Sequence, residues 1–479
     1  MLTLYVFYRK NGLITSSQSF SLNLIDGGLR SYERSAQRKN FISLMKLFSK
    51  MPENSKETLR ITNFAGLKKV SIDVKSMTVL IGPQASGKSI CAKLLYFFKG
   101  FFEEILSACE EDNDKRTLDK NYKNRFVEYF PRESWNKGEF SIKYLIDDDW
   151  MQIIKENGKS LKFSYSKGIV KLISKCRSLI SKERKENDER ISSKYRYSAR
   201  KVSLDYYRLI REMFGNQASF NQVFVPAGRS FFANLQSSIF SFLREARSLD
   251  PFLVEFGSFY ENYKRSYIRY TSREDKKTSS KRIKDADKLI SEILKGKYVR
   301  EKDQDYLLHG DARKVNLLNA SSGQQETLPL LIIIRTLLYR RVEFQLGATL
   351  YIEEPEAHLF PTAQKKVIEL LSTLFGFNGR RFQFVITTHS PYNISSLNNL
   401  IEAGRLRSQI NDEKEIAKLD KIVPSTRQIN PDCVNAYSLK NGSKKDLYDK
   451  ESGLLIADLL DEVSESISIE FGELLDIES

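Results

Sequence analysis

The sequence predicts an α/β protein built around a mostly parallel sheet, and three groups of segments carry that prediction. Met77–Ile81 is a short apolar run that leads through a glycine-containing loop into a long apolar helix at about 88–107. Ala348–Ile352 and Phe382–Thr387 are two more runs of the kind buried on both faces of a sheet. An apolar helix, Leu328–Tyr339, precedes them. Strands that alternate with helices in this way lie side by side and parallel.

The composition and charge narrow the classes of function. The chain has 479 residues, enough for two domains or for one large domain with insertions. It contains no stretch of eighteen apolar residues, which excludes a membrane-spanning helix and a membrane partner. The net charge is +16, but residues 451–479 hold nine acidic and no basic side chains, so the rest of the chain carries +25. We therefore expect acidic ligands, nucleotide or nucleic acid, and a separate acidic tail.

Cysteine usage and the N-terminus indicate where the protein works. The four cysteines show neither the spacing of metal ligands nor that of a disulfide framework. The segment Met1–Tyr8 lacks the basic stretch and the small-residue cleavage site of a signal peptide. Both observations predict a cytoplasmic protein.

Patterning along the chain predicts five parts. The N-terminal extension, 1–57, is either a loosely ordered arm or a mis-assigned start, with translation beginning at an internal methionine. The α/β domain is expected in two pieces, 58–125 and 311–400, separated by an insertion at 126–310. A C-terminal region with the acidic tail, 401–479, follows.

The insertion combines three patterns. Short strands separated by turns are predicted between residues 140 and 165, as in an antiparallel meander. Basic helical stretches occupy 171–213 and 231–310, and the strand Gln222–Pro226 between them is expected to return to the core. The basic helices are either a solvated charged face or an arm that binds a partner.

The loop after the first apolar strand matches the pattern G-x-x-x-x-G-K-[ST], in the strand–loop–helix context that this pattern requires. Its residues are Gly82, Pro83, Gln84, Ala85, Ser86, Gly87, Lys88 and Ser89. The glycines let the backbone wrap a β-phosphate, Lys88 reaches the β- and γ-phosphates, and Ser89 holds magnesium. The loop therefore predicts ATP and Mg²⁺ as ligands.

The strand Ala348–Ile352 runs into two adjacent carboxylates, Glu353 and Glu354. Downstream of a phosphate loop, the first would hold magnesium and the second would orient or deprotonate the attacking water. Glutamate stands at the first position, where aspartate is more usual. Its longer side chain still reaches the ion directly or through water.

Two further segments stand where a phosphate could be contacted. The loop before the apolar helix contains Ser321, Ser322, Gly323 and Gln324, and a helix start favours an anion. The alternative for this loop is an ordinary helix cap, formed by Ser321 or Ser322. His389 follows the buried strand Phe382–Thr387, and a histidine there can hydrogen-bond a phosphate.

These four motifs occur in the order found in ABC ATPases. The run Glu353 to Leu359, together with Thr388 to Pro391, resembles the RecF- and OLD-like ABC ATPases of the AAA15/AAA21 type. The resemblance covers about residues 58–400. It implies an ABC-type P-loop NTPase domain with a mixed sheet and a helical, basic insertion. It also implies that residues 321–324 are a signature loop and that His389 is the switch histidine. His358 would lie in the D-loop, with either a packing role or a chemical role.

Within this group, Gly82–Ser89 and Val225–Phe232 look most like the ATPases of two-gene anti-phage systems, first the sensor ATPase of PARIS and second that of Septu. That likeness implies a homodimer or higher homo-oligomer with ATP between Lys88 of one protomer and residues 321–323 of the other. It also implies a separate Toprim-like or HNH effector nuclease and a phage protein as the trigger. Either Gln222 or Arg229 is expected to couple the site to the insertion.

Other functions remain open. A RecF-like ATPase of DNA repair would grip DNA phosphates with the basic helices. A catalytically silent scaffold would not turn over ATP. An ABC transporter subunit is disfavoured, because 235 residues separate Lys88 from Gly323, more than a compact transporter domain permits.

Overall fold

The computed structural model divides the chain into two compact units, 1–52 and 53–479. It describes residues 9–10, 13–14, 55–188, 195–234, 250–272, 281–301, 304–339, 347–376, 382–449, 451–456, 468–471 and 474. In the first unit it shows β1 (Arg9–Lys10) paired antiparallel with β2 (Leu13–Ile14). The internal start considered for the N-terminal extension lies outside the described residues. All elements below belong to the second unit.

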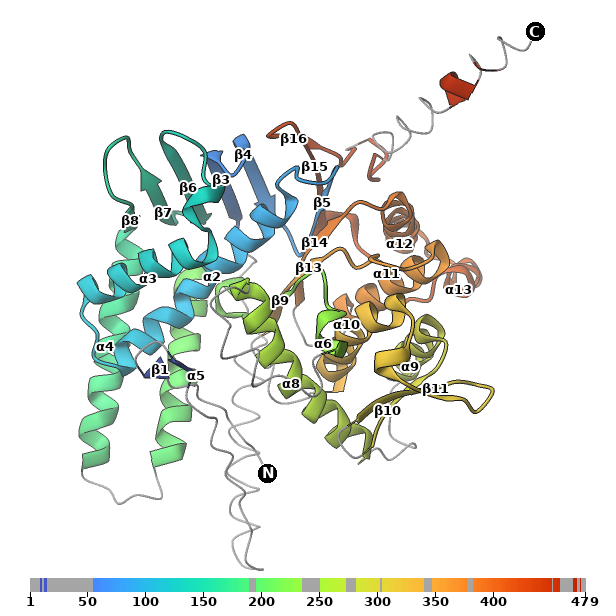
Figure 1. The fold of residues 1–479 in the computed structure, drawn as a ribbon, viewed down its shortest axis with the longest axis horizontal. Coiled ribbons are helices and arrows are strands. Elements are labelled where there is room, and N and C mark those ends of the chain that lie inside the picture. The colour runs from blue at the N-terminus through green and yellow to red at the C-terminus, as the bar shows by residue number, and fades with distance from the viewer. Residues whose placement is uncertain are drawn as a thin grey trace, which may run out of the picture. The chain divides into compact units, whose positions relative to one another are not determined.

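A six-stranded, mostly parallel sheet forms the centre of the second unit, in the order β16-β15-β5-β14-β13-β9 (Figure 1). Only the edge strand β16 pairs antiparallel to its neighbour. The strands are β5 (Met77–Ile81), β9 (Asn221–Val225), β13 (Ala348–Glu353), β14 (Phe382–Thr388), β15 (Val434–Lys440) and β16 (Ser443–Asp446). The predicted parallel strands are confirmed, and the strand predicted from the insertion is the edge strand β9.

Helices cover both faces of this sheet, which explains why β5, β13 and β14 are buried along their whole length. The helix α2 (Lys88–Glu110) packs on the face that carries Tyr351 and Val385. The opposite face, with Ile352 and Ile386, packs against three other helices. These are α10 (Ser322–Tyr339), α11 (Pro361–Phe375) and α12 (Pro391–Gln409).

A second, antiparallel sheet has the order β4-β3-β6-β7-β8. Its strands are β3 (Glu57–Phe64), β4 (Leu67–Val74), β6 (Phe140–Ile146), β7 (Asp149–Lys155) and β8 (Lys162–Tyr165). The predicted meander is therefore present, but β6 pairs with β3 of the first α/β piece. The sequence predicted that an insertion begins at residue 126. In the structure, the meander instead completes a sheet of the ATPase core. The two sheets together confirm the mixed-sheet α/β class.

The remaining segments are mainly helical, as predicted for the basic stretches. They are α3 (Lys115–Tyr129), α4 (Lys167–Asp188), α5 (Tyr195–Phe214), α6 (Phe231–Asn234), α8 (Pro251–Ser272), α9 (Lys281–Leu294) and α13 (Glu413–Ile422). Short 3₁₀ turns occupy Arg132–Ser134, Gln217–Ser219, Leu317–Asn319 and Pro431–Cys433. Within the described residues, no helix is long and apolar enough to cross a membrane.

Part of the stretch predicted as helical is instead a small antiparallel sheet. It consists of β10 (Lys297–Glu301), β11 (Gln304–Leu308) and β12 (Lys314–Asn316). Tyr298 of β10 and its register partner Leu307 of β11 are both buried, whereas the flanking pair Lys297 and Leu308 is exposed. Strands this short leave a weak period-two signal within a densely charged segment, so the helical prediction was wrong here.

A buried ion pair joins the two sheets. Lys99 of α2 donates from Nζ to both carboxylate oxygens of Glu57 in β3, at 3.1 and 2.9 Å, and to Oε1 of Gln383 in β14 at 2.6 Å. Tyr144 of β6 also donates to Glu57, at 2.9 Å. The Lys99 and Glu57 side chains are 1% and 0% exposed. Burial lowers the pKa of Lys99, and the adjacent Glu57 carboxylate opposes that change.

Replacing Lys99 with Met should destabilise the protein strongly. The substitution keeps the volume but leaves the Glu57 carboxylate buried without its cation, which costs about 3–5 kcal/mol of unfolding free energy. Lys93→Met on the same helix is the control, because Lys93 and Asp250 form a more exposed pair, 18% and 38% accessible, worth about 0–1 kcal/mol. Urea unfolding measures both variants. Equal losses would show that Lys99 has no special structural role.

Candidate active site

The phosphate-binding loop Gly82–Ser89 connects the end of β5 to the start of α2, as predicted. Gly82 and Gly87 have φ angles of 149° and 94°, a region that favours glycine. A Cβ atom at Gly82 would lie 2.2 Å from the carbonyl oxygen of Leu439, and one at Gly87 would lie 2.5 Å from Leu67. The loop therefore needs glycine at both positions for packing as well as for backbone conformation.

The Lys88 side chain folds back over its own loop. Its Nζ donates to the carbonyl oxygens of Gly82 and Pro83, both at 2.7 Å, and to Oγ of Ser86 at 3.3 Å. Burial lowers the pKa of Lys88, while Glu354 and Glu356 act in the opposite direction. The ammonium thus lies at the loop that would cradle the phosphates.

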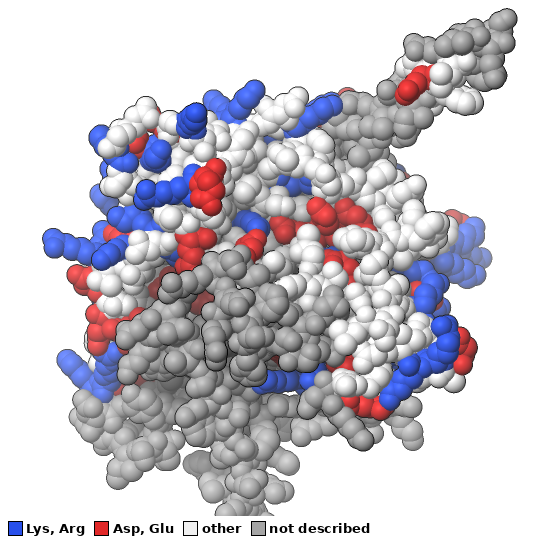
Figure 2. Space-filling model, in the orientation of Figure 1, with Lys and Arg blue, Asp and Glu red and all other residues white. Residues whose placement is uncertain are grey.

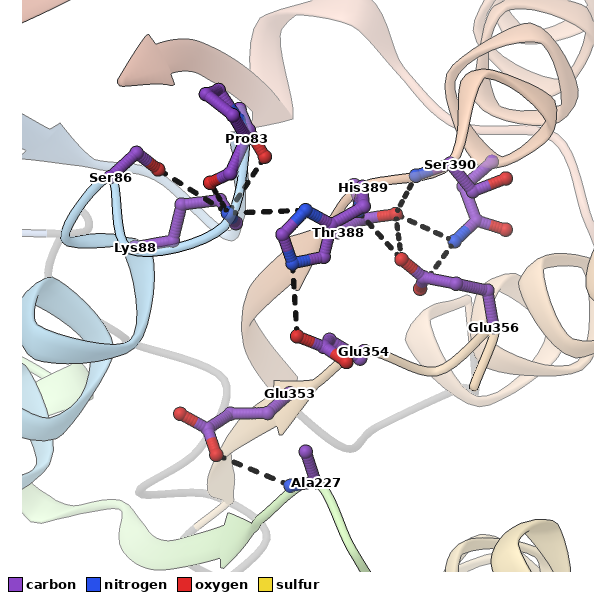
Figure 3. A network of polar contacts seen from close by, with 12 residues as sticks. Pro83, Ser86, Lys88, Ala227, Glu353, Glu354, Glu356, Thr388, His389 and Ser390 are labelled. Atoms are coloured by element: carbon purple, nitrogen blue, oxygen red, sulfur yellow. Dashed lines mark hydrogen bonds and ion pairs between the residues drawn. The ribbon is translucent and has the colours of Figure 1, made fainter. Parts of the chain in front are cut away.

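The two carboxylates after β13 point in different directions (Figure 3). Glu353 is 5% exposed, and its Oε2 accepts from the backbone N–H of Ala227 at 3.2 Å. Glu354 adopts a left-handed backbone with φ of 43°, and its N–H donates to the carbonyl of Thr387 at 2.9 Å. The left-handed turn takes Glu354 out of the strand, so the adjacent residues serve separate positions in the site.

Two buried oxygens make this edge of the sheet suitable for a divalent cation. Oε1 of Glu353 and Oγ1 of Thr387 have no hydrogen-bond partner among the described residues. These two residues are register partners in adjacent strands. Magnesium takes oxygen ligands and is often bound by one or two carboxylates plus substrate phosphates. The residues present fit such an ion, although the described residues contain no cluster of three or more His, Cys, Asp or Glu that could hold a metal by themselves.

His389 lies between the lysine and the second carboxylate (Figure 3). Its Nδ1 is 3.5 Å from Nζ of Lys88, and its Nε2 is 3.0 Å from Oε1 of Glu354. A lysine ammonium can only donate and an ionised carboxylate can only accept. The contacts therefore favour the neutral tautomer in which Nε2 carries the proton and donates it to Glu354. The structure thus brings together three residues that the sequence assigns to three different motifs.

The loop of Ser321–Gln324 is held by contacts at the start of α10. Ser321 caps α10: its Oγ accepts from the N–H of Gln324 at 3.4 Å, and Oε1 of Gln324 accepts from the N–H of Ser321 at 3.1 Å. This reciprocal pair is a capping box. Ser321 and Ser322 are exposed, whereas Gly323 is buried, and a Cβ atom there would lie 2.6 Å from the carbonyl oxygen of His358. In the described part of the chain, no hydrogen bond links this loop to Gly82–Ser89.

Of the two residues expected to couple the site, only Arg229 contacts it. The Arg229 guanidinium is fully buried and donates to the carbonyl oxygens of Glu353 at 2.7 Å and Glu354 at 3.0 Å. It also donates to the carbonyls of Pro226 and Glu326, both at 3.0 Å. Gln222 instead accepts from the hydroxyl of Tyr351 at 2.7 Å, near the start of β9.

Glu326, near the start of α10, completes the Arg229 cluster. Its carboxylate forms an ion pair with Arg229 at 3.3 Å and accepts from the N–H groups of Arg229 at 2.9 Å and Ser230 at 2.8 Å. Burial alone would raise the pKa of Glu326, but Arg229 and these N–H groups outweigh it and lower the pKa. No sequence pattern assigns Glu326 to the site, because nothing local indicates that its partner lies 97 residues away.

Charge at the site favours a bound cation. Lys88 and Arg229 are the cations that interact with Glu326, Glu353, Glu354 and Glu356, so carboxylates outnumber cations among the described side chains here. Figure 2 shows acidic side chains gathered near the middle of the visible face, with Lys and Arg mostly toward its edges. A triphosphate would add more negative charge, and a divalent ion between phosphates and carboxylates would offset it.

Comparison with known proteins gives a family match and several similar solved structures. Residues 56–394 match the family model described as an AAA ATPase domain. No curated protein matches. Similar solved structures include the SMC head domain from Thermotoga maritima, 10% identical, with a TM-score of 0.33 over 82% of this chain and 98% of that one. Another is an Smc head domain with an extended coiled coil bound to the C-terminal domain of ScpA, derived from Pyrococcus furiosus, at 12% identity and a TM-score of 0.34 over 86% and 99%. The recombination mediator RecF is 13% identical, with a TM-score of 0.28 over 83% and 99%.

Substituting Arg229 with Lys should reduce both stability and ATP turnover. Lysine keeps the charge but cannot span four carbonyl acceptors, so we expect a loss of about 2–3 kcal/mol from unmade buried hydrogen bonds. Turnover should fall more than ATP affinity, because Glu353 and Glu354 lose their backbone support. Arg427→Lys is the matched control, a half-buried arginine paired with Glu369 on α11. Urea unfolding and steady-state ATPase assays measure both. Normal ATP turnover in a destabilised Arg229→Lys protein would show that Arg229 has only a structural role.

Proposed function

The chain belongs to the AAA ATPase domain family, and we propose that it acts as an Mg-ATP-dependent switch that closes as a head-to-tail homodimer. Family membership implies ATP binding and hydrolysis. The observation that carries the proposal is the line from Lys88 through His389 to Glu354, with separations of 3.5 and 3.0 Å. A phosphate-binding lysine, a candidate sensor and a candidate base thus share one hydrogen-bonded path.

Each residue of this hydrogen-bonded path has a separate role. Lys88 binds the β- and γ-phosphates, and its present carbonyl partners give way to them. Glu354, whose ionised carboxylate is a hydrogen-bond acceptor, would take a proton from the attacking water. His389 orients that carboxylate and responds to the phosphate. Ser89 and Glu353 would hold magnesium, which would neutralise the phosphates.

The head-to-tail dimer is supported by the exposure of the signature loop. Ser321 and Ser322 are exposed at the start of α10. A second copy would bring its nucleotide to this helix start, where backbone N–H groups favour an anion. Three exposed apolar residues support such a contact, one before the signature loop, one after the D-loop and one after His389: Leu318, Phe360 and Tyr392.

For the biological role we propose a sensor in anti-phage defence that acts through a separate effector nuclease. The support is the resemblance of Gly82–Ser89 and Val225–Phe232 to ATPases of two-gene defence systems. A DNA-repair ATPase is the second candidate, because Lys167, Lys171 and Lys175 form an exposed basic stripe on α4. Their spacing of four residues puts them on one face of the helix, where they could contact phosphates.

Glu354→Gln should trap the ATP-bound state. The amide cannot accept the proton of water, so turnover should fall by about 100-fold or more while ATP still binds. The trapped protein should elute as a dimer in gel filtration with ATP and as a smaller species without it. Lys88→Ala is the control, and it should lose ATP binding itself. Unchanged turnover in Glu354→Gln would refute the assignment of the base.

Variants of the basic stripe on α4 distinguish the defence role from the repair role. In a defence role, the gene with its neighbouring genes should lower phage plating, Lys88→Ala should abolish protection, and a Lys167, Lys171 and Lys175 triple serine variant should keep it. In a repair role, the protein should bind duplex DNA with log affinity falling against log salt, by about 0.9 per phosphate contact. The triple variant should then reduce that slope. Protection without DNA binding would refute repair, and DNA binding without protection would refute defence.

A further inference from the structure

Glu356 is a third carboxylate of the site for which the sequence motifs supply no role. It lies in the turn Glu354–His358, between β13 and α11. Both ends of this turn have left-handed backbone, with φ of 43° at Glu354 and 59° at His358. Two backbone hydrogen bonds close the turn, from Ala357 to the carbonyl of Glu354 and from Leu359 to that of Glu356, both at 3.0 Å. The position of the Glu356 side chain is therefore set by a tightly folded segment.

The Glu356 carboxylate binds the segment that carries the switch histidine (Figure 3). Its Oε1 accepts from the hydroxyl of Thr388 at 2.8 Å and from the backbone N–H of His389 at 2.6 Å. Its Oε2 accepts from the side-chain amide of Asn393 at 2.9 Å. All three donors belong to residues 388–393, at the end of β14 and the start of α12. One carboxylate thus holds two adjacent chain segments together.

Few other contacts hold Thr388, His389 and Asn393 in this arrangement. Thr388 Oγ1 also accepts from the N–H of Ser390 at 3.0 Å and from Asn393 at 2.9 Å. Asn393 is 1% exposed, so its amide cannot turn to water when a partner is lost. Without the carboxylate, the N–H of His389 would have no acceptor that the described residues provide in the present geometry. The backbone that aims the imidazole at Glu354 and Lys88 therefore depends on Glu356.

We propose that Glu356 is a positioning residue for ATP hydrolysis, which sets the direction of the His389 imidazole relative to Glu354 and Lys88. The inference rests on the proposed function, because it assigns Glu356 a task only through His389 and Glu354. Glu356 itself touches neither the lysine nor the side chain of His389 in the contacts observed. Its removal should leave the phosphate loop intact, so the loss should appear in kcat rather than in the KM for ATP.

Glu356→Ala and Glu356→Gln form the test pair. Alanine removes all three acceptor contacts, and misplacing a catalytic group by about 1 Å can cost roughly 100-fold. We expect kcat to fall about 10- to 100-fold with KM changed less than about threefold. Glutamine keeps an oxygen for Thr388 and His389. Its amide can donate to Oδ1 of Asn393, which has no partner among the described residues. Glu356→Gln should therefore keep most of the activity.

A double-mutant cycle with His389→Ala separates positioning from general stabilisation. If Glu356 acts through His389, Glu356→Ala should lower kcat in the parent protein but change it little in the His389→Ala background. Glu402→Ala is the control, since Glu402 pairs with Arg405 on the exposed part of α12. It should leave kcat unchanged in both backgrounds. Thermal unfolding of each variant verifies that the assayed proteins are folded.

The outcomes are distinguishable. If the fold-losses in kcat of the two single variants multiply fully in the double variant, the role of Glu356 is overturned. It is also overturned if kcat is normal in Glu356→Ala but reduced in His389→Ala. Both outcomes leave the proposed function standing. Equal losses in Glu356→Ala and Glu356→Gln would also overturn it, because the acceptor geometry would then not matter. Normal turnover in both His389→Ala and Glu354→Gln would reject the proposed function, and the role of Glu356 with it.

Discussion

The register of three parallel strands is the constraint on which the site depends. β14 pairs with β5 so that Thr388 faces Ile81, and with β13 so that Thr387 faces Glu353. His389 follows β14, Gly82 follows β5 and Glu354 follows β13. These three residues therefore meet at one edge of the sheet. Because alternate residues of a strand face opposite sides, a slip of one residue would turn Glu353 from the α2 face to the other. Burial on both faces of the sheet prevents that slip, so the apolar core sets the geometry of the polar site.

The residues of the line from Lys88 to Glu354 could be predicted from the sequence because each directly follows an apolar strand or its loop. That pattern is local, and parallel strands bring such ends together. The contacts of Arg229 with Glu354 and of Glu356 with the end of β14 could not be predicted, because they join segments 32 to 125 residues apart. The same holds for β15, which pairs with β5 from the far end of the domain. Its strand signal is short, and only the tertiary structure shows that the ATPase core extends beyond residue 400.

Two of the buried ion pairs in the described residues connect elements that carry different motifs. Lys99 lies on the helix that begins with the phosphate loop, and Glu57 fastens that helix to the antiparallel sheet. Arg229 fastens the end of β13 to Glu326 on the helix that begins with the signature loop. Apolar residues could fill the same volume at no desolvation cost. Charged groups with several hydrogen bonds are more directional, because they are satisfied only when helix and strand are in one relative position. We therefore interpret both pairs as devices that set the spacing between motifs.

The turn from Glu354 to His358 shows why the two ends of the site cannot move independently. Left-handed backbone at a residue other than glycine costs about 1–2 kcal/mol, and it persists only where neighbouring contacts hold it. On one side, Arg229 binds the carbonyl of Glu354, and the carbonyl of Thr387 accepts the N–H of Glu354. On the other side, the carbonyl of His358 lies so close to Gly323 that any side chain there would collide with it. A shift of the signature loop toward His358 would therefore displace it, and the short closed turn would pass that movement to Glu354. Because Glu354 and the signature loop would serve different nucleotides in a head-to-tail dimer, this rigid turn is a physical route by which one site could affect the other.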